Sequence, residues 1–498
     1  MKIRTVFLLP VIAFCSVTLS WGLTWDVTNT MTATLDSDGV LTITTTKDAE
    51  AIPDYGWDKW APWHSDYEDI LSIVIGDNVT RIGHMAFYEG VSVTSVTISS
   101  SVTSIGEHAF RSCISLTTIS IPASVSLIEW KAFEYCEMLE AIQVDAANTA
   151  YSSVDGVLFN KDKSSLICYP YKKGTVYEIP STVIKIEGSA FCNAELTAIT
   201  IPNTVITIGE NAFSNTSLTS VTIPNSVENI GVFSYCSMLT SILVDAGNPN
   251  FTSDAGVLYS KDKKLLHAYP AGKKGAFTIP SSVEIVWLEA FAGCKELTSV
   301  TIPNSVTEIR ERAFEDCSGL ISVIMSKSVN YIGGYAFSYC TGLESITIPN
   351  TVTTIGYGAF YTCTALKDVK VAWTTPLIVA NDVEPFLNVN TIAATLHVPT
   401  GTKALYQVAN VWNSFGMYDD YDPAGIGSIE AHILKAHASN GILHISGLCT
   451  GEMLSIYNLA GQQLYKGIAK AEEENIPFTA HGIYIVNAGE QSVKVIMN

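Results

Sequence analysis

Charged residues and catalytic motifs are both scarce in this sequence. Only 15% of the 498 residues are Asp, Glu, Lys or Arg, and the acidic excess gives a formal net charge of −20. Such an acidic chain repels phosphate backbones and anionic lipid, which argues against nucleic acid or a lipid surface as a partner. There is also no run of about 18 apolar residues, the length that a membrane-spanning helix needs.

The usual motifs of enzymes are missing as well. The sequence has no Gly-x-Ser-x-Gly, His-Glu-x-x-His, phosphate-binding loop or Cys-x-x-Cys. Residues 36–39 (DSDG) begin like a calcium loop, but the later ligand positions are absent, so a hairpin turn is expected. His432, His437 and His444 are not spaced for one helical face, which favours strands or a linker. We therefore expect no catalytic residue, no cofactor, no metal site and no enzymatic activity.

The N-terminal segment predicts export. Lys2 and Arg4 precede a mostly apolar stretch at 6–19, and small residues follow at Ser20 and Gly22. This order is typical of a signal peptide, here assigned to 1–22. The large Phe14 immediately before Cys15 disfavours a lipoprotein signal.

A repeat accounts for the high hydrophobic content of 47%, since stacked coils bury one another's apolar residues. One unit consists of 116–122 (LTTISIP), 125–128 (VSLI) and 131–133 (KAF). The alternating apolar residues of the first segment point inward, the Thr and Ser residues point outward, and the Pro ends the strand. The anchoring Phe recurs every 20 to 23 residues except for two intervals of 58, at Phe87, Phe110, Phe133, Phe191, Phe213, Phe233, Phe291, Phe314, Phe337 and Phe360.

Each long interval contains a matching insertion. Residues 155–159 (DGVLF) and 255–259 (AGVLY) are each followed by a short polar turn and then Tyr-Pro at 169–170 and 269–270. Two apolar runs around a polar turn predict a β-hairpin. We expect the two hairpins, near 145–180 and 245–280, to project from the edge of the solenoid as spacers or recognition elements.

The segments on either side of the repeats read as caps. Residues 23–75 contain a predicted hairpin and Trp57, Trp60 and Trp63, which could stack on sugars but are better explained as filling the open end. Residues 373–425 lose the repeat and contain a predicted helix at 402–412. Such caps protect the exposed edges of a sheet.

Seven cysteines occupy one repeat position, three residues before a strand Leu. Asn193 and Asn215 stand at the same distance from Leu in two other coils. We interpret the position as a buried ladder of free thiols, each hydrogen-bonded within its own coil. The cysteines are Cys113, Cys136, Cys236, Cys294, Cys317, Cys340 and Cys363.

The repeats resemble the BspA-like leucine-rich repeats of bacterial surface proteins. The matching pattern, Ile-Pro-Asn-Ser-Val-x-x-Ile-Gly-x-x-Ala-Phe, occupies 302–314 with Arg310 in place of the Gly, and the resemblance covers about 24–425. It implies a right-handed leucine-rich-repeat solenoid with parallel strands, repeats at 76–372, and a surface protein that binds host or matrix components.

The last segment, 430–498, predicts a small β-sandwich of alternating apolar runs with Gly turns. It resembles the C-terminal sorting domain of the type IX secretion system, notably in Gly-Ile-Tyr at 482–484 and Lys-Val at 494–495. This resemblance implies a Gram-negative bacterium and contact with the secretion machinery. An ordinary terminal β-domain is the alternative.

Together these features predict a mainly β, secreted or cell-surface binding protein, an adhesin-like scaffold for a host or bacterial-surface protein or glycan. A cell-surface spacer without a specific ligand is the first alternative, and a carbohydrate-active enzyme is a more distant one. The outward Thr residues at one strand position are the predicted contact row. They are Thr97, Thr200, Thr222, Thr301 and Thr347. The two hairpins are the second candidate surface.

Overall fold

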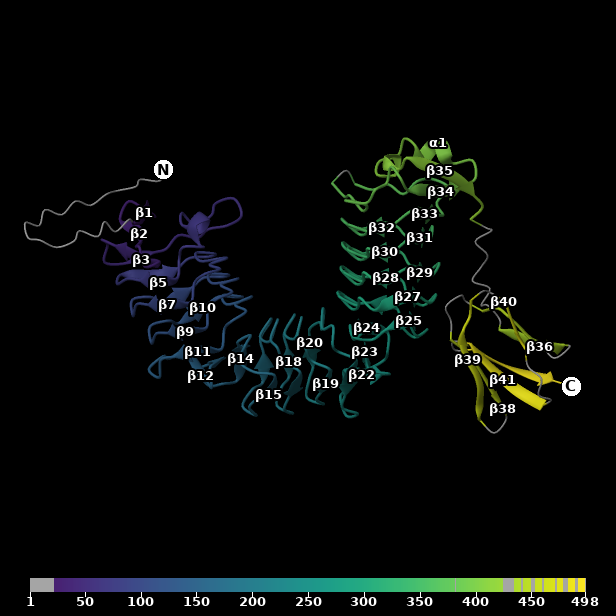
Figure 1. Cartoon of the computed structure of the whole chain (residues 1–498), viewed down its shortest axis with the longest axis horizontal. Coiled ribbons are helices and arrows are strands. Elements are labelled where there is room, and N and C mark those ends of the chain that lie inside the picture. Colours follow the sequence, from purple (N-terminus) through teal and green to yellow (C-terminus); the bar gives the residue numbers. More distant parts are fainter. Residues whose placement is uncertain are drawn as a thin grey trace, which may run out of the picture.

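The structure is a computed structural model that describes residues 22–380 and 382–423, together with 434–439, 442–448, 453–458, 461–470, 473–477, 482–488 and 491–497. The predicted signal peptide lies outside the described residues except for Gly22. Within the described part, the chain is almost entirely β-structure (Figure 1).

Residues 23–421 form a β-solenoid whose coils each contribute a first strand and a shorter second strand. Strands of successive coils pair in parallel, as β7 (Ser95–Ile98) does with β5 (Ser72–Ile75). The other first strands are β3 (Val40–Thr45), β9 (Thr118–Ile121), β11 (Ala141–Val144), β15 (Val176–Glu178), β17 (Ala198–Thr200), β19 (Ser220–Ile223), β21 (Ser241–Val244), β25 (Gly275–Thr278), β27 (Leu297–Thr301), β29 (Ser322–Ile324), β31 (Ser345–Ile348) and β33 (Asp368–Val371).

The second strands form a separate set of parallel sheets and are mostly two residues long. They are β4 (Glu50–Ala51), β6 (Val79–Ile82), β8 (Ser104–Ile105), β10 (Leu127–Ile128), β14 (Ser165–Cys168), β16 (Lys185–Ile186), β18 (Thr207–Ile208), β20 (Asn229–Ile230), β24 (Leu265–Ala268), β26 (Ile285–Val286), β28 (Glu308–Ile309), β30 (Tyr331–Ile332) and β32 (Thr354–Ile355). The parallel-strand solenoid predicted from the repeat is thus confirmed.

Alternation along the first strands builds the core. In β9, Ile119 and Ile121 are buried, whereas Thr118 and Ser120 are exposed. The anchoring Phe side chains stack between coils, with ring centroids 5.0 Å apart for Phe314 and Phe337. Equivalent stacks repeat between consecutive coils, because each coil places its Phe ring directly above the Phe ring of the previous coil.

The cysteine ladder is buried as predicted, and the nine described cysteines are all free thiols. Its hydrogen bonds differ from the prediction, because each thiol donates to the preceding coil rather than to its own. Six Sγ–O distances of 3.0 to 3.2 Å join Cys113 to Phe87, Cys136 to Phe110, Cys236 to Phe213, Cys317 to Phe291, Cys340 to Phe314 and Cys363 to Phe337.

The predicted equivalence of Asn193 and Asn215 with these cysteines is wrong. Counted from the anchoring Phe, the cysteine position in their coils holds Ala194 and Thr216, and the Thr216 hydroxyl donates to Phe213 O at 2.9 Å. In these two coils the anchoring Phe and the strand Leu are closer together in sequence than in the other coils. An alignment counted back from the Leu therefore placed the two Asn residues at the cysteine position. Both Asn residues have positive φ, 65° and 56°, which Asn tolerates better than most residues.

Two matched insertions interrupt the sheets. Strands β12 (Tyr151–Val154), β13 (Val157–Asn160) and β14 form an antiparallel unit, as do β22 (Phe251–Asp254), β23 (Val257–Ser260) and β24. The β13–β14 pairing confirms the predicted hairpin. The prediction that it projects is wrong, because Val157, Leu158 and Phe159 are fully buried and β14 continues the second-strand sheet into β16.

The insertions divide the solenoid core into three clusters. We call residues 23–144 the first block, 176–244 the second and 275–421 the third, joined by a first junction (145–175) and a second junction (245–274). In Figure 1 the three blocks follow an arc that changes direction near β12–β14 and near β22–β24. First strands such as β9, β19 and β31 lie on its outer side, and second strands such as β10, β18 and β32 lie toward its inside.

Both ends of the solenoid are covered. At the start, β2 (Met31–Leu35) pairs antiparallel both with β1 (Leu23–Asp26) and with β3. The Asp36 carboxylate accepts the N–H groups of Asp38 and Val40, as the predicted hairpin turn requires. At the other end, β34 (Thr395–Pro399) and β35 (Met417–Tyr421) extend the sheet of first strands in parallel.

The predicted helix at 402–412 is only partly formed. It is reduced to α1 (Lys403–Tyr406) and a 3₁₀ turn at Trp412–Ser414. A further 3₁₀ turn covers His64–Asp66 in the N-terminal cap. No helix in the described residues is long and apolar enough to cross a membrane.

The C-terminal segment folds as two antiparallel sheets around one core of its own, in agreement with the predicted sandwich. One sheet contains β36 (Lys435–Ser439), β37 (Ile442–Ser446) and β40 (Glu473–Pro477). The other contains β38 (Met453–Asn458), β39 (Gln463–Ile468), β41 (Gly482–Ala488) and β42 (Gln491–Met497). His437 and His444 lie on paired strands, as expected, and His432 lies outside the described residues.

Candidate functional site

In each coil, three residues at the turn that carries Ala-Phe lie at or near one surface, where some, such as Tyr135, are exposed and others, such as Tyr88 and Glu315, are largely buried. One precedes the Ala and two follow the Phe, and the first and last of them adopt positive φ, as at Lys131 (55°) and Tyr135 (58°). We call the surface made by these side chains the turn face. It consists of Met85, Tyr88, Glu89, His108, Arg111, Ser112, Lys131, Glu134 and Tyr135 in the first block, Ser189, Cys192, Asn193, Asn211, Ser214, Asn215, Ser234 and Tyr235 in the second, and Glu289, Ala292, Gly293, Arg312, Glu315, Asp316, Tyr335, Ser338, Tyr339, Gly358, Tyr361 and Thr362 in the third.

In the first block the turn face carries an arginine between two tyrosines. The Arg111 guanidinium carbon lies 5.6 Å from the Tyr88 ring centroid and 5.1 Å from that of Tyr135. Arg111 Nε and Lys131 Nζ lie 2.9 and 3.0 Å from the largely buried carboxylate of Glu134. Ion pairing and cation–π contacts therefore hold these side chains in fixed positions at the surface.

The N-terminal cap continues this aromatic surface. Trp57 is 67% exposed and packs edge-on against Trp60 and Tyr88, at centroid distances of 5.3 and 5.4 Å. Trp60 stacks on His64 at 4.3 Å. Trp63 is fully buried against Phe87, so the expectation that the tryptophans fill the end holds for Trp63 and fails for Trp57.

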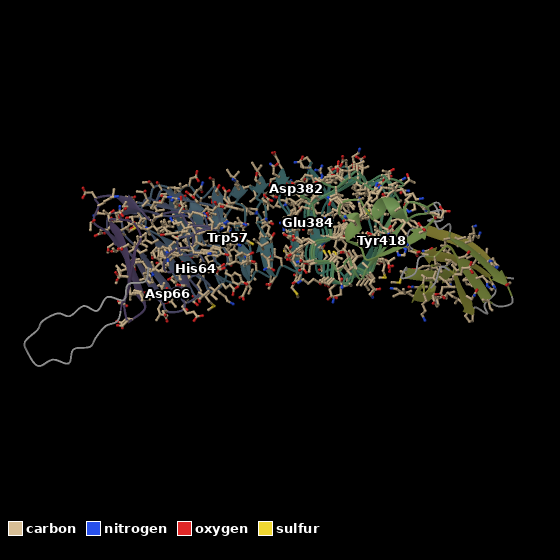
Figure 2. All side chains as sticks on the ribbon, turned by 90° about the horizontal axis from the view of Figure 1, so that it is seen from above. Trp57, His64, Asp66, Asp382, Glu384 and Tyr418 are labelled. Carbon is tan, nitrogen blue, oxygen red and sulfur yellow. The ribbon has the colours of Figure 1, made fainter. Side chains whose placement is uncertain are left out.

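The third block has a second arginine–tyrosine cluster. The Arg312 guanidinium carbon lies 5.0 Å from the Tyr335 ring centroid, and Arg312 Nη1 lies 3.0 Å from Glu315 Oε1. Tyr335 also packs edge-on against Tyr357, which is 39% exposed, and Tyr361 packs against Tyr339, which is 42% exposed. Figure 2 shows Trp57 and His64 at the opposite end of the solenoid from Glu384 and Tyr418, which belong to the C-terminal cap.

Between these clusters, the turn face of the second block consists of amides and hydroxyls, of which Asn215 is exposed and Asn193, Ser214 and Ser234 are buried. Asn215 Nδ2 donates to Asn193 Oδ1 at 2.8 Å, and the hydroxyls of Ser214 and Ser234 lie 2.9 Å apart. Burial raises the pKa of the Tyr235 phenol at its far end, so this ring stays neutral. The turn face is therefore polar in the middle and aromatic in the first and third blocks.

The predicted Thr row lies on the outer sides of the first strands. Thr97, Thr200 and Thr222 are exposed, whereas Thr301 and Thr347 are half-buried. The row is divided among the three blocks, because the first strands of one block do not pair with those of the next at either junction. In the third block the exposed side chain of Ile324, paired with Thr301, also interrupts it. The role of the row remains a prediction.

The turn face was not predicted from the sequence, because only the outward positions of the strands were considered as a binding surface. The signal was present in the sequence, because the residues flanking each Ala-Phe pair, once aligned on the Phe, include Tyr88, Arg111, Tyr135, Arg312 and Tyr335. Trp, Tyr and Arg are the residue types most enriched at binding hot spots. Among the described residues, no group of three or more His, Cys, Asp or Glu side chains is placed to hold a metal ion.

Comparison with known families identifies the repeat. The model of the BspA type leucine rich repeat region, in six copies, matches residues 65–162, 165–255 and 271–378, which is more than half of the chain. The chain belongs to the BspA-type leucine-rich repeat family. None of the curated proteins matches this BspA-type protein.

Two solved structures are similar in sequence to this BspA-type protein. A leucine-rich repeat protein from Eubacterium ventriosum is 27% identical, with a TM-score of 0.40, and the match covers 72% of this chain and 98% of that one. A leucine rich cell surface protein from Faecalibacterium prausnitzii is 25% identical, with a TM-score of 0.44, and the match covers 81% of this chain and 96% of that one.

Proposed function

We propose that this BspA-type protein is a secreted or cell-surface scaffold of a Gram-negative bacterium that binds a protein or glycan through its turn face. Family membership supports a repeat scaffold. The arrangement of Tyr and Arg on the turn face, continued by Trp57 of the N-terminal cap, is the single observation that carries the choice of surface. No step of this function requires catalysis or a cofactor.

The turn face suits binding for a physical reason. Its arginines are already clamped by ion pairs and tyrosine rings, as Arg111 is by Glu134 and Tyr135. A surface whose long side chains are ordered before binding loses less conformational entropy when a partner arrives. The outer Thr row offers short side chains and is interrupted at both junctions, and the cores of the two hairpins are buried.

Export through the type IX route is the second part of the proposal. The residues that resemble a sorting domain lie in a separate unit, for example Gly482–Ala488 in β41, whose core is distinct from that of the solenoid. A unit with its own core can be removed without unfolding the repeats.

The proposed function can be tested by capture with the full chain. Host matrix proteins, glycans and bacterial surface components serve as bait, and Tyr339→Ala and Tyr361→Ala are compared with Thr222→Lys and Thr301→Lys. All four positions are at least partly exposed, so the fold should be preserved. We expect at least a tenfold loss of affinity in the tyrosine variants and none in the threonine variants. The reverse pattern would assign binding to the first strands, and parental binding by all four would favour the spacer.

A further inference from the structure

The first junction contains a cavity of about 400 Å³ that is not explained by the stacking of the coils. In the intact first block, the turn of one coil donates N–H groups to the next coil, as from Phe110 to Ala132 O at 2.9 Å and from Ser112 to Glu134 O at 2.8 Å. At the junction the inserted hairpin interrupts this ladder. The equivalent N–H groups of Lys131, Phe133 and Tyr135 have no acceptor among the described residues.

The second junction provides an internal comparison, because its residues match the first at an offset of 100. Trp287 and His267 replace Glu187 and Ile167. The His267 ring lies 5.2 Å from Phe251 and 6.0 Å from Trp287, so aromatic rings occupy this region.

The second junction makes one bond of the turn ladder, although the Phe233 N–H, like that of Phe133, has no backbone acceptor among the described residues. Tyr235 N–H donates to Ala292 O at 3.0 Å, the bond that its counterpart Tyr135 lacks. The coil before the second junction is two residues shorter at this turn, because fewer residues separate Ile230 from Phe233 than separate Ile128 from Phe133 in the coil before the first junction. It therefore has no counterpart of Trp130 and Lys131. The first junction thus differs from its matched copy in lacking this bond and in having Trp130 in the lining of its cavity.

The lining of the cavity is apolar on its floor and polar around its edge. Phe133 and Leu158 contribute to the floor. Trp130 is 54% exposed, and its Nε1 lies 3.6 Å from where a Cβ on Gly188 would stand, so the indole reaches across from the first block toward the second. The Ser189 Oγ atom is buried without a hydrogen-bond partner.

A ligand for this cavity needs a flat apolar face and a rim of hydroxyl groups. Hydroxyl oxygens can accept from the open N–H groups, and hydroxyl protons can be donated to Ser189 or Glu187. Glu129 and Glu187 at the edge are paired with Arg81 and Lys185, and the lining cation Lys131 is paired with Glu134. These cations are already neutralised, which disfavours an anionic ligand. A pyranose ring has this chemistry, and the volume is in the range of small-ligand pockets.

We propose that the first junction is a binding subsite for a neutral saccharide, with Trp130 as its aromatic platform. The proposal rests on the proposed function and names the ligand class for one part of the turn face, since Lys131, Glu134 and Tyr135 line the cavity.

The experiment uses the full chain and four probes, namely neutral oligosaccharides of glucose, galactose, mannose and N-acetylglucosamine, in calorimetric titrations. Trp130→Ala should weaken binding of the recognised probe at least tenfold. The double variant Ile167→His/Glu187→Trp, which introduces the residues of the second junction, should abolish it. Ile324→Ala, at an exposed apolar side chain of the outer first strands, is the control and should bind as the parent does. Melting temperatures verify that each variant is folded.

Three results would overturn the proposal: no binding of any probe, parental binding by the double variant, or parental binding by Trp130→Ala. The outcome is separable from that of the proposed function. Tyr339→Ala lies in the third block and should keep saccharide binding while losing partner capture. If partner capture fails but saccharide binding still depends on Trp130, the proposed function is wrong and the saccharide subsite is supported.

Discussion

At the scale of single residues, the thiol ladder shows how one side chain links two coils. A cysteine is small enough to sit beneath the anchoring Phe of the preceding coil and can donate a weak hydrogen bond to its carbonyl oxygen. The sequence predicted burial and free thiols correctly, because the position repeats with the period of the coil. It could not reveal the acceptor, since the acceptor belongs to the neighbouring coil and depends on how the coils stack.

The thiols should be unreactive in the native protein. Burial raises the pKa of the Cys113 thiol to about 12 and also raises that of Cys340, so the reactive thiolate is scarce at neutral pH. We expect maleimide labelling of the seven ladder cysteines to be negligible natively and complete in denaturant. A disulfide-linked peptide pairing Cys294 with Cys317, detected by mass spectrometry, would contradict this result.

At the scale of elements, each hairpin is held by one buried asparagine. Asn148 Nδ2 donates to Pro122 O and Val125 O, both at 2.8 Å, and its Oδ1 accepts the N–H groups of Ala150 and Tyr151. Asn248 makes the same four bonds in the second hairpin. The matched asparagines were visible in the sequence, but their role was not, because their acceptors lie in the preceding coil.

Replacing this asparagine should destabilise the first junction. Asn148→Ala leaves four buried or partly buried backbone groups without partners, and we expect a loss of about 3 kcal/mol in the free energy of unfolding. Urea denaturation measures the effect. The exposed Asn330, changed to Ala as the control, should alter stability by less than about 0.5 kcal/mol. Equal stability of the two variants would show that the Asn148 side chain does not stabilise the first junction.

The second junction should be sensitive to acid. Burial lowers the pKa of His267 from 6.5 to about 4, so the unfolded chain binds a proton more readily than the folded one. This stabilisation is complete above pH 6.5, decreases as the pH falls toward 4 and is lost below that. His267→Ile, which introduces the residue found at position 167, should lose less stability between pH 7 and 4.5 than the parent, by roughly 2 kcal/mol.

Thermal unfolding at several pH values measures this difference. Comparing the parent with His267→Ile removes the contribution of all other titrating groups, because they are common to both proteins. Parallel pH profiles for the two proteins would contradict the assignment.

At the scale of the whole molecule, the repeat period predicted the solenoid, its parallel strands and the presence of two insertions. It did not predict the division into three blocks, because that depends on Val157, Leu158 and Phe159 being buried between coils instead of projecting. The candidate site was missed for a related reason. Arg111 and Tyr135 are 24 residues apart and become neighbours only when the coils are stacked.

Removing residues 430–498 should affect export and leave the solenoid intact. The repeats have their own core, so the shortened protein should fold and accumulate in the periplasm. We also expect the mature surface protein to lack this segment, with cleavage between residues 421 and 433. Cell fractionation and mass spectrometry of the C-terminus provide the measurement. Normal amounts of surface protein from the deletion strain would contradict type IX sorting.

The central claim is that the partner contacts the turn face. Photo-crosslinking tests it directly, with a photoreactive amino acid placed at Tyr135 or Tyr339 on the turn face, or at Thr97 or Thr222 on the outer strands, in the full chain exposed to its captured partner. All four positions are exposed. We predict adducts from the two turn-face positions and none from the outer strands. Adducts from Thr97 and Thr222 alone would contradict the account and return the binding surface to the Thr row.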